Sequence, residues 1–171
     1  MDIYIPIEPV MTETKELIEL QPYRAAYYKA VGGKGRKWHQ VKKEAFAVMI
    51  KWALAQGFDS SDLRIRVHNN GGAAKEEFYY EVHMDITEAV SVKGDSQVSL
   101  GDCEGGSFVV TPALHRMLEP TSRAFCRWLE QQEMYIMTGK CFEEFLIQDG
   151  KVELDTVVRI HFGAKRAGES E

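Results

Sequence analysis

The spacing of apolar and polar residues changes several times along the chain, and each change marks an expected element. Residues 17 to 31 are rich in β-formers and precede a glycine-rich stretch, which predicts a strand that ends in a turn. From Trp38 to Gln56, apolar residues recur at steps of three and four, which predicts an amphipathic helix ending before Gly57. The residues on its apolar face are Val41, Ala45, Val48, Met49 and Trp52.

Two strands are expected after this helix. The first covers residues 63 to 67, and a turn rich in asparagine and glycine follows it. The second covers residues 77 to 86 and alternates strictly, with Tyr80 and Val82 on an apolar face and Tyr79, Glu81 and His83 on a more polar one. The first half of the chain therefore reads strand, helix, strand, strand.

The second half repeats this order. Residues 99 to 113 form an extended stretch interrupted at Gly105 and Gly106, and Pro120 can occupy the first turn of a helix. Strands are expected at 141 to 147 and 156 to 162, joined by a turn at 148 to 150. Because Trp52 and Trp128 also fall at equivalent places in the two helices, we interpret the chain as an internal duplication.

These elements predict an α+β fold of two βαββ repeats related by a pseudo-twofold axis. We expect an antiparallel sheet with helices packed on one face and a ligand groove between the halves. The expected boundaries are an N-terminal arm or edge strand at 1–16, a domain at 17–164 and a polar tail at 165–171. Within the domain, one half covers about 17–90 and the other about 97–164.

Charge and composition narrow the classes of partner. The 171 residues carry a net charge of −5, which does not favour nucleic-acid binding by this chain alone. We interpret the basic clusters at 34–37 and at Lys42-Lys43 as solvated surface. The chain has no apolar stretch long enough to span a membrane and no recognisable signal peptide, so we expect a cytoplasmic protein.

Cysteine and histidine spacing argues against a metal site. The three cysteines are odd in number and form no Cys-x-x-Cys pair, so we expect free thiols and no disulfide. None of the five histidines has zinc-like spacing, and we expect neither a metal nor another cofactor. One alternative stays open, since Glu81 and His83 lie two residues apart on one strand face and could bind a metal or form an acid/base pair.

Several short motifs occur in an order that resembles the AraC/XylS-type effector-binding domain, also called the GyrI-like domain. They are residues 22–28 (PYRAAYY) before a glycine turn, Trp52 with Gly57-Phe58 after it, Trp128-Leu129, and residues 141–146 (CFEEFL). The resemblance covers about residues 15–164. It implies a pocket whose central glutamate is Glu143. Many members carry a helix-turn-helix regulator, whereas here we expect a free-standing binder.

The chain departs from the family pattern at three positions. Lys140 stands where proline is frequent, and Phe145 and Phe108 stand where tyrosine is frequent. Fewer hydroxyl groups are therefore available to a ligand than the resemblance implies, so the ligand chemistry can differ from the family's.

Two adjacent glutamates are the most informative charged residues. In a strand, Glu143 and Glu144 point to opposite faces, and each has apolar neighbours along its own face. Burial of an ionised carboxylate is costly unless a cation pairs with it, so such a group suits a cationic ligand or a proton transfer. The spacing leaves open which of the two is buried.

Aromatic rings attract cations and can complete such a site. The predicted ligand-binding residues are Glu143, Tyr27, Trp38, Tyr79, Phe108, Trp128 and Phe145. The leading hypothesis is a binding or sequestering protein for a hydrophobic, cationic drug-like molecule, and we favour a binding protein over an enzyme without deciding between the two. The alternatives are a hydrolase of electrophilic toxic compounds that uses Glu143, or a protein-interaction module that acts as an inhibitor. A homodimer is also possible, because a sheet edge can pair with a second copy.

Overall fold

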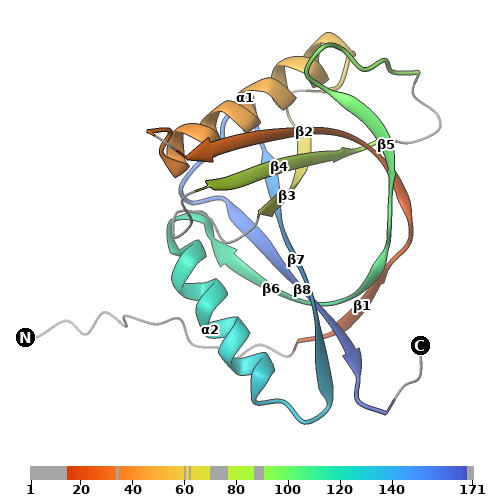
Figure 1. The fold of residues 1–171 in the computed structure, drawn as a ribbon, viewed down its shortest axis with the longest axis vertical. Coiled ribbons are helices and arrows are strands. Elements are labelled where there is room, and N and C mark those ends of the chain that lie inside the picture. Colours follow the sequence, from red (N-terminus) through yellow and green to blue (C-terminus); the bar gives the residue numbers. More distant parts are fainter. Residues whose placement is uncertain are drawn as a thin grey trace, which may run out of the picture.

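The computed structural model describes residues 15–33, 35–59, 61, 63–69, 77–86 and 91–168, and its elements follow the predicted order (Figure 1). The first half contains β1 (Leu17–Leu20), β2 (Tyr23–Gly33), α1 (Trp38–Ala55), β3 (Leu63–Asn69) and β4 (Glu77–Asp85). The second half contains β5 (Ser99–Cys103), β6 (Gly106–Leu114), a 3₁₀ turn (His115–Met117), α2 (Leu118–Glu130), β7 (Tyr135–Ile147) and β8 (Val157–Arg166). The predicted arm at 1–16 lies outside the described residues except for Lys15 and Glu16, which are not in a strand.

The strands in the described part of the chain form one eight-stranded sheet with the order β1-β6-β8-β7-β3-β4-β2-β5, and their pairings are antiparallel. The second repeat supplies β6-β8-β7 and the first supplies β3-β4-β2. The equivalent strands of the two repeats therefore follow in opposite order on either side of the β7–β3 pair, as a pseudo-twofold axis requires. This arrangement confirms the predicted α+β duplication. It also places the seam between the repeats at the centre of the sheet.

The two ends of the sheet are connected through continuous chain. Leu17 pairs with Val109 in the β1–β6 ladder, and the β2–β5 ladder keeps the same register, with Tyr23 opposite Cys103. Figure 1 shows the two long bent segments running together along one side of the molecule. The sequence predicts a single strand over 17–31, but the structure breaks it into β1 and β2 at Pro22, which has no N–H to donate to a ladder.

The bend between β5 and β6 requires a glycine at position 105. A Cβ built on Gly105 would lie 1.9 Å from the carbonyl oxygen of Leu20. We therefore expect Gly105→Ala to lower the free energy of unfolding by about 1–3 kcal/mol, the scale of overpacking, as measured by urea denaturation. Gly106→Ala is the matched control, because its Cβ would come no closer than 3.3 Å to a ring carbon of Phe108. Equal stability of the two variants would contradict this account of the bend.

Both helices cover the same face of the sheet, as predicted, and each closes its own apolar core. Buried residues of α1 pack on β2, β3, β4 and β7, while α2 packs on β6 and β8. The buried residues of α1 are Val41, Ala45, Phe46, Met49, Trp52 and Ala53, and those of α2 are Thr121, Phe125 and Leu129. Phe46 is absent from the predicted face, and the predicted Val48 is only half-buried. Neither helix is long and apolar enough to span a membrane in the described part of the chain.

The last two strands are longer than the sequence predicts. β7 begins at Tyr135, six residues before the predicted start. Its pairing with β8 shifts register between Met137 and Cys141, which separates the first part of the strand from the part that the sequence predicts. Gly139 has a φ of 86° in this interval, which interrupts the alternation that identifies a strand. β8 continues to Arg166, so the predicted polar tail overlaps the sheet.

Candidate functional site

Glu143 lies at the seam between the two apolar cores. Its neighbours across the sheet are Val67 on β3 and Ile160 on β8, and these belong to the first and the second core respectively. Glu143 therefore projects from the helix-covered face of β7, and it is half-buried there. The structure thus assigns Glu143 to the helix face and Glu144 to the opposite face of the sheet.

A lysine from α1 reaches this seam. Lys42 Nζ lies 2.9 Å from His115 Nε2 and 5.1 Å from the ring centroid of Phe145. The contact joins α1 to the 3₁₀ turn that precedes α2, so it bridges the helical layers of the two repeats. The prediction that Lys42 is solvated surface is wrong for this residue, because the helical turn points its side chain over the sheet and not into solvent.

The charged groups at the seam perturb one another. Burial raises the pKa of Glu143 to about 6, and the nearby Lys42 partly opposes this shift. Burial lowers the pKa of Lys42, and Glu143 opposes that shift in turn. Burial and the charge of Glu143 also raise the pKa of Tyr80, whose buried hydroxyl has no hydrogen-bond partner among the residues that the structure describes. The seam therefore holds a carboxyl group that gains or loses its proton near neutral pH.

Several aromatic rings lie on the same face of the sheet as this group. Phe145 and Phe46 meet edge to face with centroids 5.1 Å apart, and Phe46 lies 6.0 Å from Tyr80. Trp38, the first residue of α1, packs edge-on against Tyr80 at 5.0 Å. Two of the predicted aromatic site residues, Trp38 and Phe145, are thus on the same face as Glu143.

The other predicted aromatic residues lie elsewhere. Tyr27, Tyr79 and Phe108 project from the opposite face of the sheet, where Tyr27 lies 6.0 Å from His83 and Phe108 lies 5.0 Å from Phe142. Trp128 stacks on Phe125 in the second core at 6.0 Å. The seven predicted residues therefore do not converge on one site.

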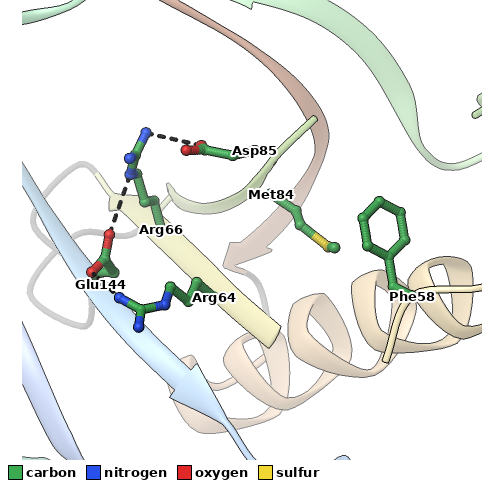
Figure 2. A pocket seen from close by; sticks show the side chains of 6 residues that line it. All are labelled: Phe58, Arg64, Arg66, Met84, Asp85 and Glu144. Atoms are coloured by element: carbon green, nitrogen blue, oxygen red, sulfur yellow. Dashed lines mark ion pairs between the residues drawn. The ribbon is translucent and has the colours of Figure 1, made fainter. Parts of the chain in front are cut away.

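The helix-free face carries a polar pocket of about 430 Å³, shown in Figure 2. At its centre, Arg66 of β3 places Nε 3.5 Å from Glu144 Oε2 and Nη1 3.0 Å from Asp85 Oδ1. The guanidinium also lies over the ring of Tyr23 at 4.4 Å. Only 11% of the Arg66 side chain is exposed, so Glu144 is engaged in a buried ion-pair network.

A second pocket of about 270 Å³ opens on this face, and Tyr79, Phe108, Phe142 and His68 are among the residues that line it. Phe142 stacks on His161 with centroids 4.2 Å apart, and His68 lies 4.4 Å from His83. Sequence reasoning missed His68 and His161 as parts of this cluster.

Two histidines of this cluster, His68 and His161, favour their neutral forms. Burial, reinforced by the neighbouring His83, lowers the pKa of His68 to about 4. Burial also lowers the pKa of His161. Within the described ranges, no group of three or more histidine, cysteine or acidic side chains could hold a metal ion.

Comparisons with solved structures support the fold. The C-terminal domain of EcmrR superposes with a TM-score of 0.67 at 10% identity, covering 92% of this chain and 100% of that one. SAV2435 bound to tetraphenylphosphonium gives 0.55 at 13% identity, covering 90% and 94%. A hydrolase from Listeria innocua gives 0.55 at 11% identity, covering 88% and 91%. No family model matches the sequence, and no curated protein matches it significantly. The similarities confirm the fold that the resemblance to effector-binding domains predicts.

Proposed function

We propose that this chain binds a hydrophobic organic cation at the seam between its repeats, with Glu143 as the counter-charge. The observation that carries the proposal is a carboxyl group held between two apolar cores, with its pKa raised to about 6 by burial. A carboxylate of this kind, half-buried between apolar side chains, is stabilised most by a cation that brings little water with it. Organic cations with their charge spread over a hydrophobic surface meet this requirement.

Lys42 supports the same assignment. In the ligand-free chain, Lys42 is the cation that acts on Glu143, and its own burial disfavours its charged form. A hydrophobic cation would take over this role and let Lys42 move to solvent, at the expense of the contact between Lys42 and His115. Trp38 supplies ring surface on the same face, and a cation–ring contact contributes about 0.5–2 kcal/mol, whereas the fully buried Phe145 packs beneath the site.

The structural neighbours are consistent with this proposal. SAV2435, whose structure contains tetraphenylphosphonium, shares the fold over most of both chains. Tetraphenylphosphonium is therefore a suitable probe, and tetraphenylborate is an anion of the same shape.

We expect Glu143→Gln to weaken tetraphenylphosphonium binding by about 1.5–3 kcal/mol, the scale of a charge-assisted contact, in a calorimetric titration at pH 7.5. Glu144→Gln is the matched control, since that side chain lies on the opposite face, and its affinity should stay within about twofold of the unchanged chain. Tetraphenylborate should bind the unchanged protein more weakly than tetraphenylphosphonium does, because the carboxylate of Glu143 repels an anion. Equal affinities of the unchanged chain and Glu143→Gln would remove the charge role from Glu143.

A hydrolase is the second candidate function. A carboxyl group with a pKa of about 6 can act as a general base at neutral pH, and a neighbour is a hydrolase from Listeria innocua. The two candidates separate on turnover, because an enzyme would consume an electrophilic substrate and lose that activity in Glu143→Gln, whereas a binding protein would release its ligand unchanged.

A further inference from the structure

We propose that Cys103, His83 and Glu81 form a nucleophilic triad on the helix-free face, with Cys103 reacting with small uncharged electrophiles. The Sγ atom of Cys103 lies 3.5 Å from His83 Nδ1, and His83 Nε2 lies 2.6 Å from Glu81 Oε1. This is the order nucleophile, base, orienting carboxylate. The site lies on the other face of the sheet from Glu143, so it does not depend on the proposed cation site.

The topology explains how the three residues meet. Glu81 and His83 are two apart on β4 and share one face, whereas Cys103 ends β5, with β2 between the two strands. His83 lies opposite Tyr27 of β2 and Cys103 lies opposite Tyr23, so the residue of β2 between these two positions on the same face is Ala25, which lies opposite Gly101. These two residues have almost no side chain, so the imidazole of His83 can reach across β2 to the thiol.

The carboxylate fixes the proton on the imidazole. An ionised Glu81 only accepts hydrogen bonds, so His83 Nε2 carries the proton and donates it, which leaves Nδ1 free to accept the proton of the Cys103 thiol. In agreement, the hydrogen bond from His83 is the main cause that lowers the pKa of Glu81. Glu81 is then in position to stabilise the imidazolium that forms when Cys103 reacts.

The surrounding groups keep the resting cysteine as a thiol. Burial raises the pKa of Cys103, and the carboxylates of Glu81 and Asp85 add to this effect, while Tyr23 and Arg66 oppose it. His68 also faces His83 with its ring 4.4 Å away, and its lowered pKa keeps it neutral, while the ring of Tyr27 lies 6.0 Å from His83. Reaction therefore requires His83 as a general base rather than a preformed thiolate.

An electrophile has a route to the sulfur atom. Cys103 is partly exposed, whereas His83 is buried. Tyr23, which interacts with the thiol, lines the 270 Å³ pocket together with the apolar rings of Phe108 and Phe142. Glu104 and Lys140 also line this pocket, and Cys103 lies beside it through its contact with Tyr23 and does not line it, so a small uncharged molecule with an activated carbon atom is the expected reactant.

The reaction balances without a further reactant. The thiol proton passes to His83 Nδ1, the sulfur forms a bond to the electrophilic carbon, and the leaving group departs with its electron pair. With iodoacetamide as the probe, iodide leaves, a thioether forms, and the proton passes from His83 to solvent.

The experiment is a time course of iodoacetamide alkylation at pH 7, read for each cysteine by peptide mass spectrometry on the folded full chain. Cys126 and Cys141 are internal controls. Desolvation is the main cause that raises the pKa of both thiols, that of Cys141 to about 11, although Cys141 is exposed at the surface. No histidine contact is found at either thiol among the described residues, and the greater exposure of Cys141 means that access alone does not favour Cys103. We expect Cys103 to react at least about tenfold faster than either, and His83→Gln to slow Cys103 by about 10²-fold, the lower scale of general-base catalysis.

The control thiols also report on folding. Unfolding of the His83→Gln chain would speed the reaction of Cys126 and Cys141, so unchanged rates at these two positions show that the loss at Cys103 is local. Glu81→Gln provides a second variant that keeps the imidazole, and it should slow Cys103 by a smaller factor. Glu143→Gln should leave the Cys103 rate unchanged, which separates this site from the cation site. A Cys103 rate equal to that of Cys126, or unaffected by His83→Gln, would overturn the proposal.

Discussion

Phe145→Ala is expected to lower the free energy of unfolding by about 3–5 kcal/mol. The ring of Phe145 is fully buried at the seam, with 0% of its surface exposed. It meets Phe46 edge-on at 5.1 Å and His115 at 5.3 Å, so its removal opens a cavity between α1 and the turn before α2. Since the structure on both sides is held by separate cores, the cavity cannot collapse fully, and the loss should lie at the upper end of the usual range. Urea denaturation at pH 7.5 measures it.

Two further variants serve as controls for the expected loss of stability. Phe145→Leu keeps most of the buried volume and should cost about 1–1.5 kcal/mol. Leu154→Ala removes an apolar side chain that is 63% exposed and should change stability by less than about 0.5 kcal/mol. A loss below about 1 kcal/mol in Phe145→Ala would show that the seam is not a packed junction between the repeats.

Arg66→Gln is expected to destabilise the fold by about 3 kcal/mol, because it leaves two carboxylates without their counter-charge. Glu144, of which 18% is exposed, faces Arg66 Nε at 3.5 Å, and the half-exposed Asp85 faces Nη1 at 3.0 Å. Burial already raises the pKa of Asp85, and Arg66 opposes that shift. Loss of Arg66 should therefore raise the pKa of Asp85 further, and the destabilisation should shrink as the pH falls and the carboxylates take up protons.

The neighbouring arginine provides the control. The side chain of Arg64 is 67% exposed and lies 4.0 Å from Glu144, so Arg64→Gln should cost about 0.5 kcal/mol or less. In the double variant Arg66→Leu/Glu144→Leu, both members of the buried pair become apolar, and part of the stability should return. If Arg66→Gln and Arg64→Gln cost the same at pH 7.5, the network in the 430 Å³ pocket contributes no more than a surface ion pair.

Local spacing predicted the features that depend on one element. The strict alternation around Tyr80 and Val82 predicted the face of β4 that packs under α1, and both side chains are buried there. The adjacency of Glu143 and Glu144 predicted that they occupy opposite faces of one strand. The repeated order of strand, helix, strand, strand predicted the duplicated fold, because the spacing of apolar residues switches between strand and helix periodicity in the same order in both halves.

Features that depend on distant segments could not be predicted in this way. The helix-free face is formed where β1 and β2 run alongside β5 and β6, a pairing that no periodicity within one element reveals. For this reason Tyr27, Tyr79 and Phe108 could not be separated from Glu143, and Cys103 could not be connected with His83. Lys42 looked like surface since charged residues in a helix are usually solvated, and only the position of α1 over the seam shows otherwise.

The most direct test of the cation site is the pH dependence of tetraphenylphosphonium affinity between pH 5 and pH 7.5, measured by calorimetry. The pKa of Glu143 is about 6, above its ordinary 4.5, so most of the group is neutral at pH 5 and ionised at pH 7.5. The account predicts about tenfold weaker binding at pH 5 than at pH 7.5 in the unchanged chain. In Glu143→Gln the affinity should be low and independent of pH. The same pH dependence in both chains, or none in either, would contradict the role of Glu143 as the counter-charge.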